Sequence, residues 1–146
     1  MSNEPSSLSE GQLVSRVDLA NLHIPQKILD ELQAAKNFLV IFAPRPNIIK
    51  INVFPSDSDE IVKILIKLTE FSPETVKTIA SIIRMLNLPN LYTSGMCIRE
   101  NECVYEAYIE KDKLEVDVDS IQNEFEKVAN VKSVEVYSLT TEQQYE

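Results

Sequence analysis

The sequence predicts an α+β fold, in which a strand–helix–strand–strand–helix–strand domain follows a smaller β-rich segment. A length of 146 residues allows one ordinary domain or two small ones, and 44% hydrophobic with 25% charged residues is a globular composition. Apolar residues recur with strand and helix periods in the stated order. No run reaches the roughly 20 apolar residues of a membrane helix, and the start has no signal-peptide pattern, so we expect a cytoplasmic protein.

The chain is predicted to have two folded parts between two tails. Proline, serine and aspartate gather in Pro55-Ser56-Asp57-Ser58-Asp59, between two strand-like patterns, and this composition is typical of a linker. We therefore expect, in order, a flexible tail at 1–12, a β-rich segment at 13–56, a linker at 57–59, the larger domain at 60–139 and a flexible tail at 140–146.

The larger domain begins with a half-buried strand over residues 61–69, where apolar residues alternate with Lys63 and Lys67. A helix follows. Ser72 is a good N-cap and Pro73 suits the first helical position. Its apolar stripe is predicted to comprise Val76, Ile79, Ala80, Ile83 and Leu86.

A hairpin, a helix and a strand complete this domain. The predicted hairpin joins residues 91–98 to 103–109, and the last strand covers 131–139. The helix between them is capped near Asp117, with an apolar stripe of Val118, Ile121, Phe125 and Val128. Two helices cover only one face of such a sheet, so the other face needs water or a partner. Lys63, Lys67 and the tyrosines predict a mixed surface there, and pairing with a second copy is the usual solution.

This element order and the turn before the first helix resemble the ACT-like regulatory domains over residues 60–139. The family has a ferredoxin-like βαββαβ fold, and its turn usually carries an acidic residue, a proline and a glycine. Glu70 and Pro73 fit that turn, whereas Glu74 stands where the glycine is expected. The resemblance implies a small-molecule effector at Glu70, Ser72, Pro73 and Glu74, or a domain kept for dimerisation.

The β-rich segment is similar, over about residues 14–56, to the AbrB-like swapped-hairpin DNA-binding family. A strand-like run from Arg16 to Ile24 precedes Pro25 and a short helix, and two apolar strands follow at 38–42 and 48–54. Such a segment is too small to bury a core alone, so it is expected to interlock with a second copy. The resemblance implies DNA contact through Arg16 and Lys27, with a purely dimerising role as the alternative.

The net charge of −9 is unevenly distributed along the chain. Residues 13–56 carry five bases against three acids, whereas residues 57–146 carry nine bases against eighteen acids. Phosphate backbones repel acidic surfaces, so any DNA contact is expected before residue 57. The dense acids of the second half are interpreted as solvated edges and caps: Glu106, Glu110, Asp112, Glu115, Asp117 and Asp119.

Catalytic and metal-binding patterns are not recognisable in the sequence. Gly11 and Gly95 are too few for a phosphate loop, and His23 is interpreted as a surface or hydrogen-bonded histidine rather than a catalytic base. Cys97 and Cys103 are predicted to be reduced, small core residues without zinc spacing. We therefore expect no enzyme, no metal and no cofactor. The leading hypothesis is a dimeric transcriptional regulator or sensor, and the alternative is an oligomeric protein-interaction module that does not bind DNA.

Overall fold

The computed structural model describes residues 9–141 as two compact units, which divide between Ala35 and Lys36. The tails predicted at 1–12 and 140–146 lie largely outside the described residues. The fold is α+β, with two antiparallel sheets and four α-helices among the described residues. None of the helices in the described part has both the length and the apolar character needed to cross a membrane.

The N-terminal unit contains two short helices, α1 (Arg16–Leu19) and α2 (Gln26–Glu31). The strand predicted from Arg16 is wrong. Ser15 caps α1 instead, its hydroxyl accepting a hydrogen bond from the Asp18 amide at 3.3 Å, and no residue of either helix is buried. The helix predicted after Pro25 is confirmed as α2.

The second unit opens with a two-stranded sheet formed by β1 (Asn37–Arg45) and β2 (Ile48–Ser56). This hairpin confirms the two apolar strands expected there. The segment predicted as a linker is a hydrogen-bonded turn, in which Ser56 and Ser58 are buried. The Ser56 hydroxyl accepts a hydrogen bond from the Ser58 amide at 3.1 Å, and the Lys36 amide donates to Asp57 at 2.9 Å.

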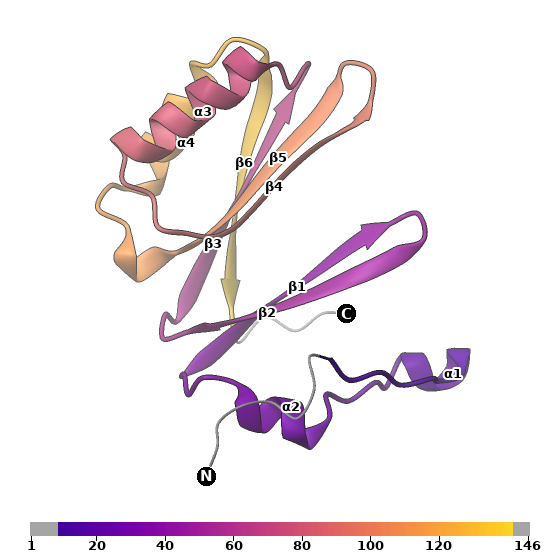
Figure 1. Ribbon diagram of the computed structural model, residues 1–146. Coiled ribbons are helices and arrows are strands. Elements are labelled where there is room, and N and C mark those ends of the chain that lie inside the picture. The colour runs from indigo at the N-terminus through magenta and orange to yellow at the C-terminus, as the bar shows by residue number, and fades with distance from the viewer. Residues whose placement is uncertain (1–8, 142–146) are drawn as a thin grey trace. The chain divides into compact units, whose positions relative to one another are not determined.

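A four-stranded sheet follows, and its elements confirm the strand–helix–strand–strand–helix–strand order. They are β3 (Glu60–Leu68), α3 (Pro73–Met85), β4 (Asn90–Arg99), β5 (Glu102–Glu110), the 3-10 helix η1 (Lys111–Lys113), α4 (Val118–Glu126) and β6 (Val131–Thr140). The strands lie in the order β4-β5-β3-β6. Figure 1 shows α3 and α4 side by side on one face of this sheet.

The main core lies between these two helices and the sheet. Alternation along β3 places Ile64, Ile66 and Leu68 in this core with no exposed area, as predicted. The stripe predicted for α4 is confirmed, with Ile121 and Phe125 fully buried. The stripe predicted for α3 is partly wrong, because the helix is rotated: Val76 is exposed, and α3 buries Thr75, Ile79 and Ile82.

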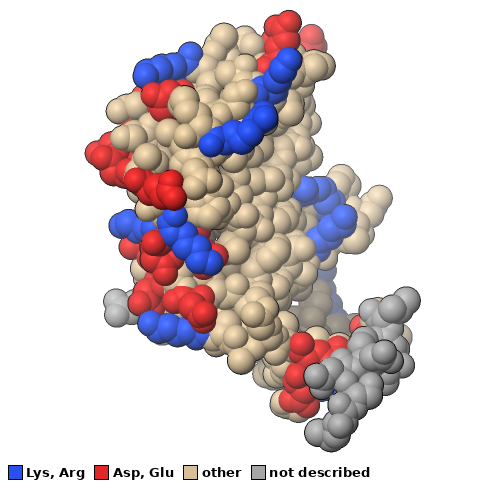
Figure 2. All heavy atoms as spheres, turned by 60° about the vertical axis from the view of Figure 1, so that its left-hand side comes forward, with Lys and Arg blue, Asp and Glu red and all other residues tan. Residues whose placement is uncertain are grey.

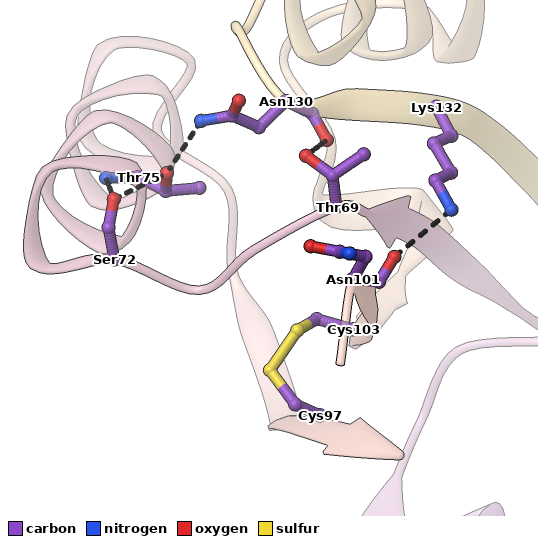
Figure 3. Close-up of a disulfide and its surroundings, with 8 residues drawn as sticks. All are labelled: Thr69, Ser72, Thr75, Cys97, Asn101, Cys103, Asn130 and Lys132. Carbon is purple, nitrogen blue, oxygen red and sulfur yellow. Dashed lines mark hydrogen bonds between the residues drawn. A yellow bond between two sulfur atoms is a disulfide. The ribbon is translucent and has the colours of Figure 1, made fainter. Parts of the chain in front are cut away.

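Cys97 and Cys103 form a disulfide, so the prediction that both are reduced is wrong (Figure 3). The cause is the register of the β4–β5 hairpin, which places the two residues directly opposite each other with Cα atoms 3.8 Å apart. Cys103 is buried as predicted, whereas Cys97 is exposed. Spacing along the sequence alone does not reveal the register of a hairpin.

The second face of the four-stranded sheet is partly covered by the β1–β2 hairpin. Leu39 and Ile41 from β1 form a second buried cluster with Ile61 and Tyr108 from the sheet. The rings of Tyr92 and Tyr108 lie 6.0 Å apart at their centroids and extend this contact. The chain therefore covers one end of the face that the sequence assigned to a partner.

Candidate functional site

The turn between β3 and α3 places the four residues predicted to bind an effector at the start of α3. The Ser72 hydroxyl accepts from the Thr75 amide at 3.2 Å and lies 2.9 Å from the Thr75 hydroxyl. Pro73 occupies the first turn, and Glu74 is exposed there. The cap and the proline confirm the local prediction, and both serve to start the helix.

The polar groups of this turn are largely used by the chain itself. Asn130 has a positive φ of 75°, and its side-chain amide donates to a Glu70 carboxylate oxygen at 3.0 Å. The Thr69 amide donates to the Asn130 carbonyl at 2.8 Å. Figure 3 shows Asn130 reaching toward Thr75 on the first turn of α3. Asn130 thus ties the predicted ligand turn to the start of β6, and it is not among the site residues predicted from the sequence.

A groove of about 490 Å³ lies between the hairpin and the uncovered part of the sheet. Its lining is mainly apolar and aromatic and includes Ile41, Phe42, Arg45, Lys63, Tyr92 and Tyr108. This volume falls within the range of small-molecule sites. No ligand was predicted here from the sequence, because the groove depends on how the hairpin folds onto the sheet.

Lys63, together with Arg45, supplies the positive charge that lines this groove. Its ammonium lies 5.4 Å from the centroid of the Tyr108 ring and 3.5 Å from a Glu106 carboxylate oxygen. Burial lowers the pKa of Lys63, but hydrogen bonding and charge attraction from Tyr108 and Glu106 outweigh it, so the pKa is raised above 10.5. Lys63 therefore remains charged at neutral pH while it is only about a quarter exposed.

A second polar group lies further along the same face. Lys67 pairs with Glu135 at 3.6 Å, and the Tyr137 hydroxyl donates to Glu135 at 3.0 Å. This hydrogen bond raises the pKa of Tyr137 above 10. The face is therefore the mixed surface that the sequence predicts from its lysines and tyrosines.

Glu110 is buried, so its interpretation as part of a solvated edge is wrong. The Ser56 hydroxyl donates to one carboxylate oxygen at 2.9 Å, and the Lys113 ammonium lies 3.1 Å from the other. Ser56 ends β2 and Glu110 ends β5, so their bond fastens the hairpin to the sheet. Local sequence pattern does not predict the Ser56–Glu110 pair, because the two residues lie 54 positions apart.

The two residues predicted to contact DNA lie on separate helices of the N-terminal unit. Arg16 begins α1 and Lys27 lies in α2, and both are exposed. Lys27 is paired with Glu10 at 2.7 Å. This ion pair offsets one of the two positive charges predicted to face phosphate.

No protein-family model matches this chain, and no curated protein matches it. Among residues 9–141, no cluster of three or more His, Cys, Asp or Glu side chains is placed to hold a metal ion. What the chain can do is therefore inferred from its own residues.

Proposed function

We propose that this chain is a regulatory protein that associates with itself and whose larger domain is an ACT-like domain of ferredoxin-like fold. The single observation that carries the proposal is the four-stranded sheet with strand order β4-β5-β3-β6 and both helices on one face. Such a domain leaves one sheet face for regulation, either by a partner or by a ligand. We include in this proposal that the protein is located in the cytoplasm.

The groove beside Lys63 is the place we assign to a small effector. The predicted turn is less suited, because Glu70 is already bonded to Asn130 and Glu74 adds a negative charge. The groove instead offers aromatic rings, a charged ammonium and an apolar wall formed by the hairpin. An effector that contacts both the hairpin and the sheet would bind more tightly to one relative position of these two elements than to another. Regulation requires such a difference in affinity between two conformations.

A thermal-shift screen of the full chain against amino acids and nucleotides tests this function. A ligand that binds the native state at about 100 to 1,000 times its Kd raises the free energy of unfolding by about 3–4 kcal/mol. We expect Lys63→Ala to abolish the shift and Glu74→Gln to preserve it. The opposite pattern would move the site to the turn, and a flat screen with a monomeric protein would contradict the proposal.

DNA binding is a second candidate, favoured by one observation. The chain carries no acid between Glu31 and Asp57, whereas Lys36, Arg45 and Lys50 fall in that stretch. A gel-shift assay at low salt tests it, since phosphate contacts are strongest there. The expected signature is binding that weakens steeply with salt and is reduced by Arg16→Ala. Absence of binding at low salt would leave the protein-interaction module as the function.

A further inference from the structure

The two faces of the β1–β2 hairpin differ sharply in chemistry. Residues directly opposite each other in an antiparallel pair share a face, and the register pairs Val40 with Val53, Phe42 with Ile51 and Pro44 with Ile49. We call these six residues the hairpin outer face. The neighbouring pairs Leu39–Phe54 and Ile41–Asn52 belong to the other face, where Leu39 and Ile41 are buried against the four-stranded sheet.

The hairpin outer face is apolar, and five of its six residues are exposed while Val53 is half-buried. Phe42 and Pro44 of this face also line the groove beside Lys63. Phe42 is 60% exposed, Ile49 62% and Ile51 52%. None of its six residues is polar, and register places Lys50 and Arg45 on the opposite face, across from Ala43 and Ile48. Soluble monomers rarely expose a contiguous apolar face of this kind, so it marks an interaction surface.

We propose that the hairpin outer face is the surface through which two copies of this chain associate, outer face against outer face. This inference rests on the proposed self-association and names where it occurs. A two-fold dimer needs a patch that is complementary to itself, and an uncharged apolar strip satisfies that need without polar groups to match. Strongly apolar interfaces are typical of homodimers, whereas partners of different chemistry rely more on polar contacts.

Charge supports the same surface. Each copy carries a net charge of −9, so two copies repel when acidic surfaces meet. On the side of the molecule drawn in Figure 2, acidic and basic side chains lie interspersed along one margin. The hairpin outer face contains no ionised group, and the whole hairpin contains no acid. It therefore brings two acidic chains together without placing like charges in contact.

The size of the face places the expected dimer among small, weak interfaces. Strands of nine residues are about 30 Å long and a pair of them about 10 Å wide. With side-chain relief each copy contributes about 500 Å², so the dimer buries about 1,000 Å² in total, near the lower limit for a specific interface. We therefore expect a reversible dimer with a Kd in the micromolar range, formed by packing two hairpins at the sheet-to-sheet distance of about 10 Å.

Sedimentation equilibrium of the full chain, from about 1 to 200 µM, tests the interface. We expect a monomer–dimer equilibrium that Ile49→Lys weakens at least about tenfold, because a lysine buried against the partner would lose its hydration. Val76→Lys is the matched control on exposed helix surface and leaves the Kd unchanged. Ile51→Lys provides a second interface variant, and far-UV circular dichroism verifies that each variant is folded.

Each remaining outcome overturns the inference in a distinguishable way. Ile98→Lys alters an exposed apolar residue on β4, which lies in the other sheet. If Ile98→Lys separates the dimer while Ile49→Lys does not, association occurs through the four-stranded sheet; the inference then fails but the proposed self-association stands. A wild-type chain that is monomeric at about 200 µM overturns both.

Discussion

Gly95 stands on β4 directly opposite Tyr105, and the ring of Phe71 occupies the space that a side chain at this position would need. A Cβ atom added here would lie 2.7 Å from the Cζ atom of Phe71. Phe71 in turn packs against Tyr105, with ring centroids 6.2 Å apart. The glycine thus lets the β3–α3 turn close over the sheet.

We predict that Gly95→Ala lowers the free energy of unfolding by about 1 kcal/mol, because the Phe71 ring must move aside. In a Phe71→Ala background the same change should instead stabilise by about 0.5 kcal/mol, since alanine loses less backbone entropy than glycine. Urea unfolding of the four proteins in this cycle measures the coupling. Equal effects in both backgrounds would contradict the contact.

The Ser56 side chain makes two hydrogen bonds at the end of the hairpin. Its hydroxyl donates to buried Glu110 and accepts from the Ser58 amide. We predict that Ser56→Ala lowers the free energy of unfolding by about 1–3 kcal/mol, because the buried Glu110 carboxylate loses one of its two partners and the Ser58 amide loses its acceptor. Exposed Ser138→Ala on β6 is the control and should change it by less than about 0.5 kcal/mol. Urea midpoints at constant slope provide the measurement.

Among the elements, the strands and helices of the larger domain were predictable from local pattern, and their details were not. Alternation along β3 and the caps of α3 and α4 are local chemistry, so Ser72 and Asp117 mark the helix starts correctly. The rotation of α3 that exposes Val76 and buries Thr75 depends on the sheet beneath it. α1 was missed because its four residues are too few to show a helical period. Its one local signal is the Ser15 side chain, which caps the helix.

The start of α4 makes a pH-dependent contribution to stability. The Asp117 carboxylate accepts a hydrogen bond from the Ser120 backbone amide at 2.7 Å and a second one from the Ser120 side chain. These bonds, the backbone bond more than the other, lower the pKa of Asp117 from its ordinary value of 3.8. A carboxyl whose pKa is lower in the folded state stabilises the protein above its unfolded pKa, and the contribution disappears as pH falls through the folded value.

Asp117→Asn keeps a good cap that does not titrate. We therefore predict that wild-type melting temperature falls relative to that of Asp117→Asn as the pH is lowered from about 5 to about 2. Thermal unfolding of both proteins across this range is the measurement. Parallel profiles would show that the carboxylate does not cap the folded helix.

At the scale of the whole molecule, the disulfide joins β4 to β5 beside the turn of their hairpin. Its two cysteines lie six residues apart in the sequence. Closing so short a loop limits the unfolded chain only modestly, so we predict that reduction lowers the free energy of unfolding by about 2 kcal/mol. Urea unfolding with and without a reductant measures this, and Cys97→Ser is the control that should not respond.

The same bond bears on the proposed cytoplasmic location, because cytoplasmic thiols are usually kept reduced. Alkylation of the protein as isolated from cells, followed by intact mass measurement, distinguishes the two states. Free thiols would agree with a cytoplasmic protein that folds without the cross-link. A complete disulfide would point to an oxidising compartment and contradict that part of the proposal.

The sequence by itself determined the α+β class, the order of elements in the larger domain and the residues that begin α3 and α4, because these follow from periodicity and from contacts within a few residues. The tertiary structure decided the features that join distant segments. Register paired Cys97 with Cys103, burial joined Ser56 to Glu110, and the folding of the hairpin onto the sheet created both the groove at Lys63 and the exposed outer face. Such features depend on which strands meet and in which register, and local chemistry does not specify either.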